Sequence, residues 1–143
     1  MLRNALREDA LTSGPEGYEL RIGLPWIRSM PLSCILGLSV TLSVSMDRWS
    51  PAAVRVRLGN RTVRTDELAD EPGWWFIQDR LVLVFPAGDF SSGDVIQDVA
   101  VDFELMIPYL SGGAAGPLVL PFHLEASLRT SQEVLEGVSR DVA

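Results

Sequence analysis

The chain has 143 residues, of which 47% are hydrophobic, enough to build one folded domain around one core. All 12 basic residues are arginines, and against 19 acidic residues they leave a net charge of -7, which argues against a nucleic-acid partner. One cysteine, Cys34, and one histidine, His123, exclude an internal disulfide and a zinc site built from these residue types. We therefore predict a single domain over residues 1–143, with residues 1–16 and 130–143 as less ordered termini.

The sequence shows no targeting segment. Its first residues carry charges where an export signal needs an apolar core. The most apolar stretch, Ile35 to Met46, is shorter than the roughly 20 residues of a membrane-spanning helix, and it has Ser or Thr at nearly every second position. We expect a cytoplasmic protein that has no membrane partner.

Strand patterns dominate the first half of the chain. Apolar and polar residues alternate over Leu20–Leu24 and over Ile35–Met46, which gives each strand one buried and one solvated face. The alternation continues over Val54–Leu58 and Arg61–Val63, and Gly59-Asn60 marks a turn between them. These segments predict successive strands with short connections.

The second half of the chain continues the pattern. Leu81–Phe85 is a short apolar run, and Val95–Ile107 alternates apolar with acidic or polar residues. Leu118–Leu128 closes the series, and Pro121 within it predicts an edge strand because proline cannot donate a ladder hydrogen bond. Turns rich in glycine separate these strands, at Pro86–Gly93 and Gly112–Pro117.

Helix is a minor component, with candidates at Thr65–Asp70 and Ser131–Val138. About seven strands, each with one apolar face, pack most naturally as two antiparallel sheets face to face. The predicted fold is therefore all-β, an antiparallel β-sandwich of jelly-roll-like type.

The Pro25–Ser33 loop joins two of the predicted strands, yet it carries bulky apolar side chains. In one interpretation Trp26, Ile27 and Met30 cap one end of the core. In the other, Trp26 and Arg28 form an aromatic and cationic surface, since these residue types are enriched at interface anchors. The sequence of the loop is compatible with both interpretations.

Two adjacent tryptophans, Trp74 and Trp75, pose the same alternative. Neighbouring residues of a strand point to opposite faces, so only one of the two indoles can enter the core. The candidates for a partner interface or for the edge of a substrate channel are Trp26, Arg28, Met30, Trp74 and Trp75.

We assign no catalytic residue and no metal ligand. His123 is expected to be an ordinary surface or half-buried residue, and Cys34 a small buried thiol with nothing basic next to it. Asp98, Asp102 and Glu104 lie along one side of a predicted strand, where exposure to solvent explains them.

The segment from Gly17 to Ser33 resembles the small β subunit of bacterial C-glycoside deglycosidases. The resemblance is most specific in this stretch, which runs from a strand through Leu-Pro, an aromatic residue and Arg to Pro-Leu-Ser. This chain has Trp26-Ile27 where two tyrosines are typical of the family. Further similar segments extend the resemblance to Leu128, at Gly59-Asn60, Glu67–Ala69, Trp74–Arg80, Gly88–Gly93 and Pro108-Tyr109.

The resemblance implies an accessory subunit of a heteromeric carbon-carbon lyase that cleaves 3-oxo-C-glycosides by elimination. It implies a larger, metal-dependent barrel subunit (α) as partner, which carries the base and a divalent metal, manganese. The isolated chain is then expected to be inactive and to hold no cofactor of its own.

Two other functions compete with this one. A free-standing carbohydrate-binding module would stack Trp26, Trp74 and Trp75 on sugar rings. A self-sufficient hydrolase would use Asp98 and Asp102, but neither carboxylate has an evident reason for a shifted pKa.

Overall fold

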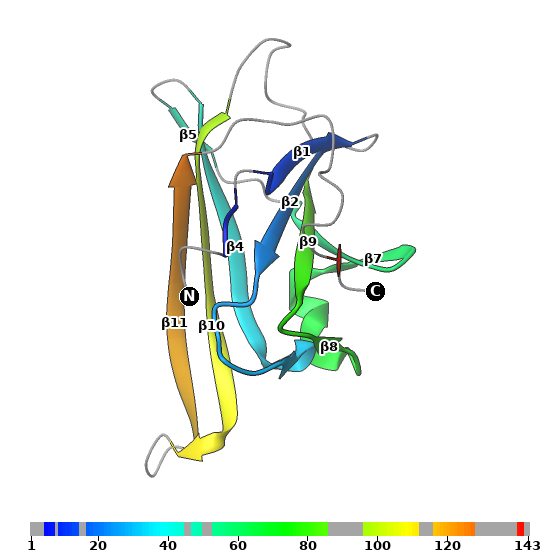
Figure 1. Cartoon of the computed structure of the whole chain (residues 1–143), viewed down its shortest axis with the longest axis vertical. Coiled ribbons are helices and arrows are strands. Elements are labelled where there is room, and N and C mark those ends of the chain that lie inside the picture. The colour runs from blue at the N-terminus through cyan, green and yellow to red at the C-terminus, as the bar shows by residue number, and fades with distance from the viewer. Residues whose placement is uncertain are drawn as a thin grey trace.

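The computed structural model describes residues 5–7, 9–14, 17–44, 47–49, 53–85, 96–111, 116–127 and 140–141. Two sheets lie face to face (Figure 1), and their long strands pair antiparallel, which confirms the predicted all-β sandwich. The helices within these residues are two short 3₁₀ segments, η2 (Leu32–Cys34) and η3 (Thr65–Asp70). The helix expected at Ser131–Val138 lies outside the described residues.

The first sheet has six strands in the order β1-β2-β9-β6-β7, and a short β12 pairs with β9 as well. β9 is buried along its whole length because it lies in the middle of this sheet. The bounds are β1 (Leu11–Gly14), β2 (Gly17–Gly23), β6 (Arg55–Leu58), β7 (Arg61–Arg64), β9 (Asp79–Phe85) and β12 (Arg140–Asp141).

The second sheet has four strands in the order β11-β10-β4-β5. β11 lies at its edge, which confirms the position that Pro121 predicts. The bounds are β4 (Ile35–Val44), β5 (Asp47–Trp49), β10 (Ile96–Ser111) and β11 (Pro117–Ser127), and the two-residue strands β3 (Met30–Pro31) and β8 (Trp74–Trp75) form a separate small pair.

Strand β4 contains a β-bulge that the alternation of its residues conceals. Asp102 pairs with Ser39 and Glu104 with Leu36, so two residues of β4 lie opposite the single Phe103 of β10. One of these two residues is Gly37, whose φ of 61° falls in the left-handed region that glycine adopts readily. The glycine therefore permits the bulge.

The core lies between the two sheets. Each sheet contributes its apolar alternate residues, and the side chains of Leu20, Leu83, Leu42 and Val101 are fully buried there. This interior is what the period-two pattern predicts, because residues two apart on a strand point to the same face. Among the described residues, no helix has the length and hydrophobicity to cross a membrane.

Two short strands lie within the terminal segments 1–16 and 130–143. β1 lies within residues 1–16, where its Leu11 pairs with Leu20 of β2 and is fully buried. Asp9 just before it accepts a hydrogen bond from Arg80 at 3.0 Å, and both side chains are buried. At the other terminus β12 pairs with the start of β9. The contacts of Asp9 and of β12 are with β9, which is distant in sequence, whereas β1 forms a hairpin with β2.

Candidate functional site

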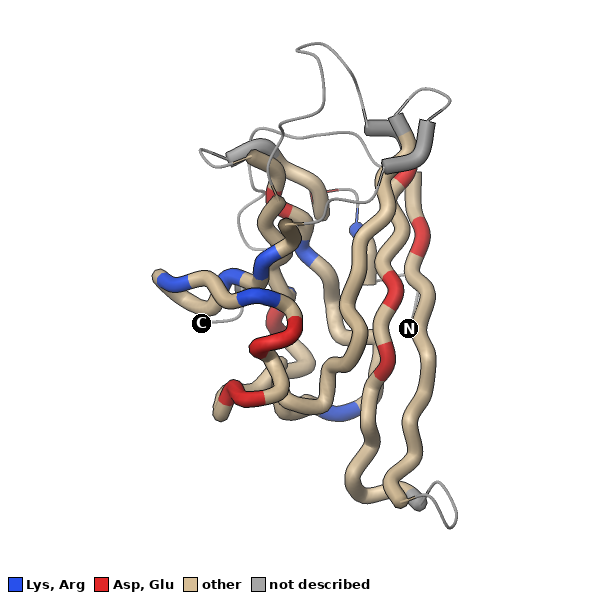
Figure 2. The backbone as a smooth tube through the Cα atoms, turned by 180° about the vertical axis from the view of Figure 1, so that it is seen from behind, with Lys and Arg blue, Asp and Glu red and all other residues tan. Residues whose placement is uncertain are grey.

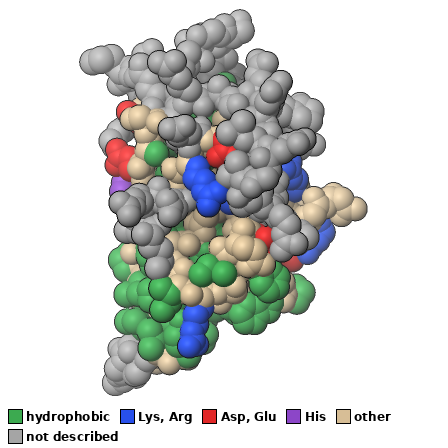
Figure 3. All heavy atoms as spheres, in the orientation of Figure 1, with side chains coloured by type: hydrophobic (Ala, Val, Ile, Leu, Met, Phe, Trp, Pro, Cys, Tyr) green, Lys and Arg blue, Asp and Glu red, His purple; other side chains and the backbone are tan. Residues whose placement is uncertain are grey.

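One end of the sandwich carries most of the large hydrophobic side chains that the described residues expose. The loop after β2, strand β8 with the turn after it, and the end of β10 contribute them, and Figure 3 shows hydrophobic side chains gathered toward the lower end of the molecule. The members and their exposed fractions are Ile27 61%, Trp74 46%, Phe76 47%, Ile77 48%, Tyr109 47% and Leu110 39%.

Tyr109 connects the predicted aromatic and cationic residues of the loop. The indole Nε1 of Trp26 donates a hydrogen bond to the Tyr109 Oη at 2.6 Å. The guanidinium carbon of Arg28 lies 4.9 Å from the centroid of its ring, a cation-π distance. Trp26 and Arg28 thus contact the same tyrosine, which lies 83 residues away from Trp26 in the sequence.

A series of aromatic contacts continues from this patch into the core. Trp26 meets the edge of Phe122 at 6.4 Å between centroids, Phe122 stacks on Phe103 at 5.6 Å, and Phe103 contacts Trp75 at 6.2 Å. Aromatic pairs at these separations stabilise by about 1 kcal/mol each beyond their burial. Trp26 therefore packs against aromatic side chains that lead into the core, and in this respect it also caps the core.

Two segments distant in sequence are tied together at the same end. Ser29 Oγ accepts a hydrogen bond from the backbone N–H of Ile77 at 2.8 Å, and Leu32 N donates to the carbonyl of Gly73 at 3.0 Å. Met30 pairs with Trp75 in the β3-β8 ladder. These links fix the loop after β2 beside the turn after β8.

The structure separates the five candidate residues into two groups. Met30 and Trp75 are 1% and 0% exposed and belong to the core, because the β3-β8 pair directs both side chains inward; they are therefore corrected from surface candidates to core residues. The Trp75 indole donates a buried hydrogen bond to the carbonyl of Asp79 at 3.1 Å. Trp74 points to the other face, as strand alternation requires.

The three remaining candidates, Trp26, Arg28 and Trp74, belong to a larger surface that we call the end surface. It consists of Trp26, Ile27, Arg28, Trp74, Phe76, Ile77 and Tyr109. The candidate list from the sequence lacked four members of this surface, Ile27, Phe76, Ile77 and Tyr109.

A second cluster lies on the solvent face of the four-stranded sheet. His123 Nδ1 is 2.6 Å from a carboxylate oxygen of Asp102, and Nε2 is 3.0 Å from one of Glu125. These hydrogen bonds, the one to Glu125 foremost, raise the pKa of His123 above its usual 6.5. Both ring nitrogens are engaged, so neither is available as a catalytic base.

An open groove surrounds this histidine. Acidic residues follow the long strands that form it (Figure 2), and Ser127 Oγ donates to Asp98 at 2.7 Å. His123 is therefore an exposed surface residue, as predicted, but one held between two carboxylates. Polar residues that line the groove are Thr41, Ser43, Asp98, Asp102, His123 and Glu125.

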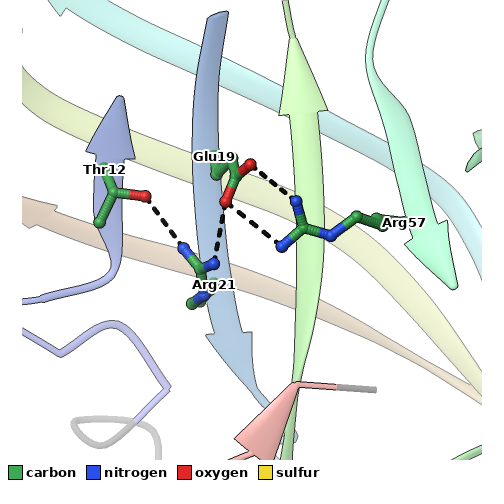
Figure 4. Close-up of polar contacts among 4 residues, drawn as sticks. All are labelled: Thr12, Glu19, Arg21 and Arg57. Carbon is green, nitrogen blue, oxygen red and sulfur yellow. Dashed lines mark hydrogen bonds and ion pairs between the residues drawn. The ribbon is translucent and has the colours of Figure 1, made fainter. Parts of the chain in front are cut away.

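A third cluster lies on the first sheet, around Glu19 (Figure 4). Its carboxylate accepts hydrogen bonds from Arg57 Nη1 at 2.7 Å and from Arg21 Nη2 at 2.9 Å. Arg21 Nη1 also donates to Thr12 Oγ1 at 3.0 Å, so the cluster joins β1, β2 and β6. Burial alone raises the pKa of Glu19, but the two arginines together outweigh it and lower that pKa below 4.5.

A metal centre requires several ligating side chains grouped around one point. Within the described ranges, no three His, Cys, Asp or Glu side chains are grouped as metal ligands. Cys34 is a free, buried thiol as predicted, and burial raises its pKa, which keeps the thiol in its less reactive protonated form. The end surface combines exposed apolar side chains with the guanidinium of Arg28.

Comparison with known proteins points to one group. No family model matches the chain. It is 39% identical over 100 residues to the C-glycoside deglycosidase beta subunit of Arthrobacter globiformis, covering 68% of this chain and 71% of that protein. It is 35% identical over 104 residues to the protein of the same name from Microbacterium trichothecenolyticum, covering 69% and 72%. A 3'-dehydrocarminate deglycosidase beta subunit from a Microbacterium species is 32% identical over 110 residues, covering 72% and 76%.

Proposed function

The chain belongs to the family of C-glycoside deglycosidase beta subunits, and from this we propose that it is the noncatalytic subunit of a heteromeric carbon-carbon lyase. Its partner is a larger, metal-dependent barrel subunit (α), and the complex acts on 3-oxo-C-glycosides in the cytoplasm. The observation that carries the proposal is the match to beta subunits over more than two thirds of the chain.

The proposed reaction is an elimination. The ketone at C3 of the sugar makes the proton on C2 acidic, so a base can remove it. The electron pair of that C–H bond forms a double bond between C1 and C2 as the bond from C1 to the aglycone carbon breaks. The aglycone carbon then takes a proton. A divalent metal, manganese, on the larger subunit would supply stabilisation of the negative charge at the ketone oxygen.

In this proposal the present chain binds the larger subunit through the end surface and helps to exclude water from the reacting sugar. Fixed, exposed aromatic and apolar side chains support such a role, because they lose little conformational freedom when a partner covers them. His123, the single histidine, already contacts two carboxylates of its own sheet. We accordingly assign the base to the larger subunit in this proposal.

Reconstitution tests the proposal. Three preparations are made: this chain alone, the larger subunit alone, and the two chains produced together. Each preparation is then assayed for cleavage of a 3-oxo-C-glycoside. We expect the two chains to co-purify and the complex alone to show full activity. Turnover by this chain without the larger subunit would contradict the noncatalytic role, and absence of any complex would contradict the proposal as a whole.

Metal content provides an independent measurement. We expect elemental analysis to find less than about 0.1 equivalent of manganese, zinc or iron in this chain purified alone, because no described side chains form a ligand set. A stoichiometric metal in this chain would contradict our proposal, which places the metal on the larger subunit. A glycan-binding screen of the same preparation tests the carbohydrate-binding alternative, to which Trp75 no longer contributes because it is buried.

A further inference from the structure

Arg28 differs in its contacts from five other described arginines, which form ion pairs within the chain. Arg21, Arg57, Arg61, Arg64 and Arg80 each lie within 3.0 Å of a carboxylate oxygen of this chain. Among the described residues, no carboxylate forms an ion pair with Arg28. Its contact is the Tyr109 ring, at 4.9 Å from the guanidinium carbon.

The surroundings of Arg28 are apolar. Its neighbour Ile27 is 61% exposed, and Ser29 on its other side ties the loop to Ile77, which is 48% exposed. Tyr109 is held in place by the hydrogen bond from Trp26. A guanidinium thus lies on an aromatic ring within an apolar area, at a place fixed by contacts of the loop.

A partner that covers this area removes water from the guanidinium as well as from the apolar side chains. A charge that loses its water without gaining a counter-charge opposes binding, whereas a hydrogen-bonded carboxylate offsets that loss. Arginine binds carboxylates in a two-pronged geometry, so the pair also fixes the orientation of the two subunits.

We propose that the larger subunit presents an Asp or Glu carboxylate to Arg28, and that Tyr109 is the positioning residue that holds the guanidinium for this ion pair. The inference rests on the proposed function, in that the larger subunit is the occupant of the end surface. It adds the chemistry of the contact, which is an acidic group enclosed by apolar contacts.

The test measures the dissociation constant of the full chain and the larger subunit by titration calorimetry. The variants are Arg28→Lys, Arg28→Met and Arg28→Glu. We expect affinity to fall in that order, with a loss of about 10-fold for Met and about 100-fold or more for Glu. The matched control is Arg64→Glu, which makes the same change of charge at an exposed arginine of β7 and should alter affinity less than about 3-fold.

Arg28→Met is the variant that tests for a carboxylate partner, because methionine keeps much of the side-chain length and lacks the charge. Affinity of Arg28→Met equal to or above that of the wild type would overturn the proposal, since it would show an apolar counterpart. Thermal unfolding of each variant verifies that it is folded. Reversing one acidic residue of the larger subunit to lysine should restore at least about 10-fold of the affinity lost by Arg28→Glu. If no single reversal on the larger subunit restores binding, the carboxylate is contradicted.

Tyr109 is tested through its coupling to Arg28. Tyr109→Leu should weaken binding by about 10-fold in the wild type but by less than about 3-fold in the Arg28→Met background, as expected for a residue that acts through Arg28. Equal losses in both backgrounds would contradict the positioning role. Failure of the wild-type chain to bind the larger subunit would contradict the proposed function itself, whereas normal binding by Arg28→Glu contradicts only the inference about Arg28.

Discussion

The Glu19 cluster and the end surface differ in the contacts that their charged groups make. On the first sheet Glu19 lies between Arg57 and Arg21, and its partners come from strands of the same chain. At the end of the sandwich Arg28 lies on an aromatic ring among exposed apolar side chains.

The difference separates charges that support the fold from a charge that is available for recognition. A carboxylate between two arginines has its hydrogen bonds made within the chain, so it stabilises the folded state and offers little to a partner. A guanidinium beside exposed hydrophobic side chains retains donors for a second molecule. We therefore expect changes in the two regions to affect different measurements.

The largest effect on folding is expected below the end surface, at Trp75. Its indole is fully buried, contacts Phe103 and donates a hydrogen bond to Asp79, so Trp75→Ala leaves a cavity and an unpaired carbonyl. We expect this variant to lose about 3–5 kcal/mol of unfolding free energy in urea denaturation. A loss below about 1 kcal/mol would show that this indole is not part of the core.

Trp74, the neighbour of Trp75, is expected to affect binding and not folding stability. Trp74 is 46% exposed, and we expect Trp74→Ala to change the unfolding free energy by less than about 0.5 kcal/mol. Calorimetric titration with the larger subunit should show binding weaker by about 2 kcal/mol, as for an interface anchor. Normal affinity together with reduced stability would show that Trp74 is not part of the contact between the end surface and the larger subunit.

Glu19→Gln tests the cluster whose charges are paired within the chain. Loss of the carboxylate leaves Arg21 without its ion pair to Glu19 in a buried position, which should reduce the unfolding free energy by about 2 kcal/mol at neutral pH. Affinity for the larger subunit should not change. An affinity loss in a fully folded variant would break the distinction between the two regions.

The same variant has a pH signature. The pKa of Glu19 is lower in the folded chain than the usual 4.5, so its stabilisation is complete above pH 4.5 and is lost as the pH falls through the folded pKa. The wild type should therefore lose more stability on acidification than Glu19→Gln does. Parallel curves of stability against pH would contradict the lowered pKa.

The smallest effect is expected at His123, where the ion pairs are exposed to solvent. The pKa of this histidine is raised above 6.5, so its stabilisation is complete below pH 6.5 and is lost as the pH rises through the folded pKa. Melting temperatures of the wild type and His123→Gln should converge toward alkaline pH, with the wild type higher at about pH 6. A difference that grows with pH would have the wrong sign.

Local patterns in the sequence were sufficient for the long strands and for the sandwich. The alternation over Ile35–Met46 and over Val95–Ile107 corresponds to β4 and β10, because the period of two belongs to each strand separately. Pro121 likewise identified an edge strand through a property of the residue itself. Strand β1 was missed, since four residues are too few for a periodic signal and its pairing with β2 decides it.

The polar clusters and the end surface depended on the tertiary structure. Glu19 and Arg57 are 38 residues apart, and Trp26 and Tyr109 are 83 residues apart, so their contacts exist only when the strands are placed in register. Alternation required that one of Trp74 and Trp75 be buried, but the pairing of β3 with β8 decided which one. The sequence by itself determined which faces of the strands are apolar, because that follows from side chains along one strand; the packing of distant segments decided which side chains remained for a partner.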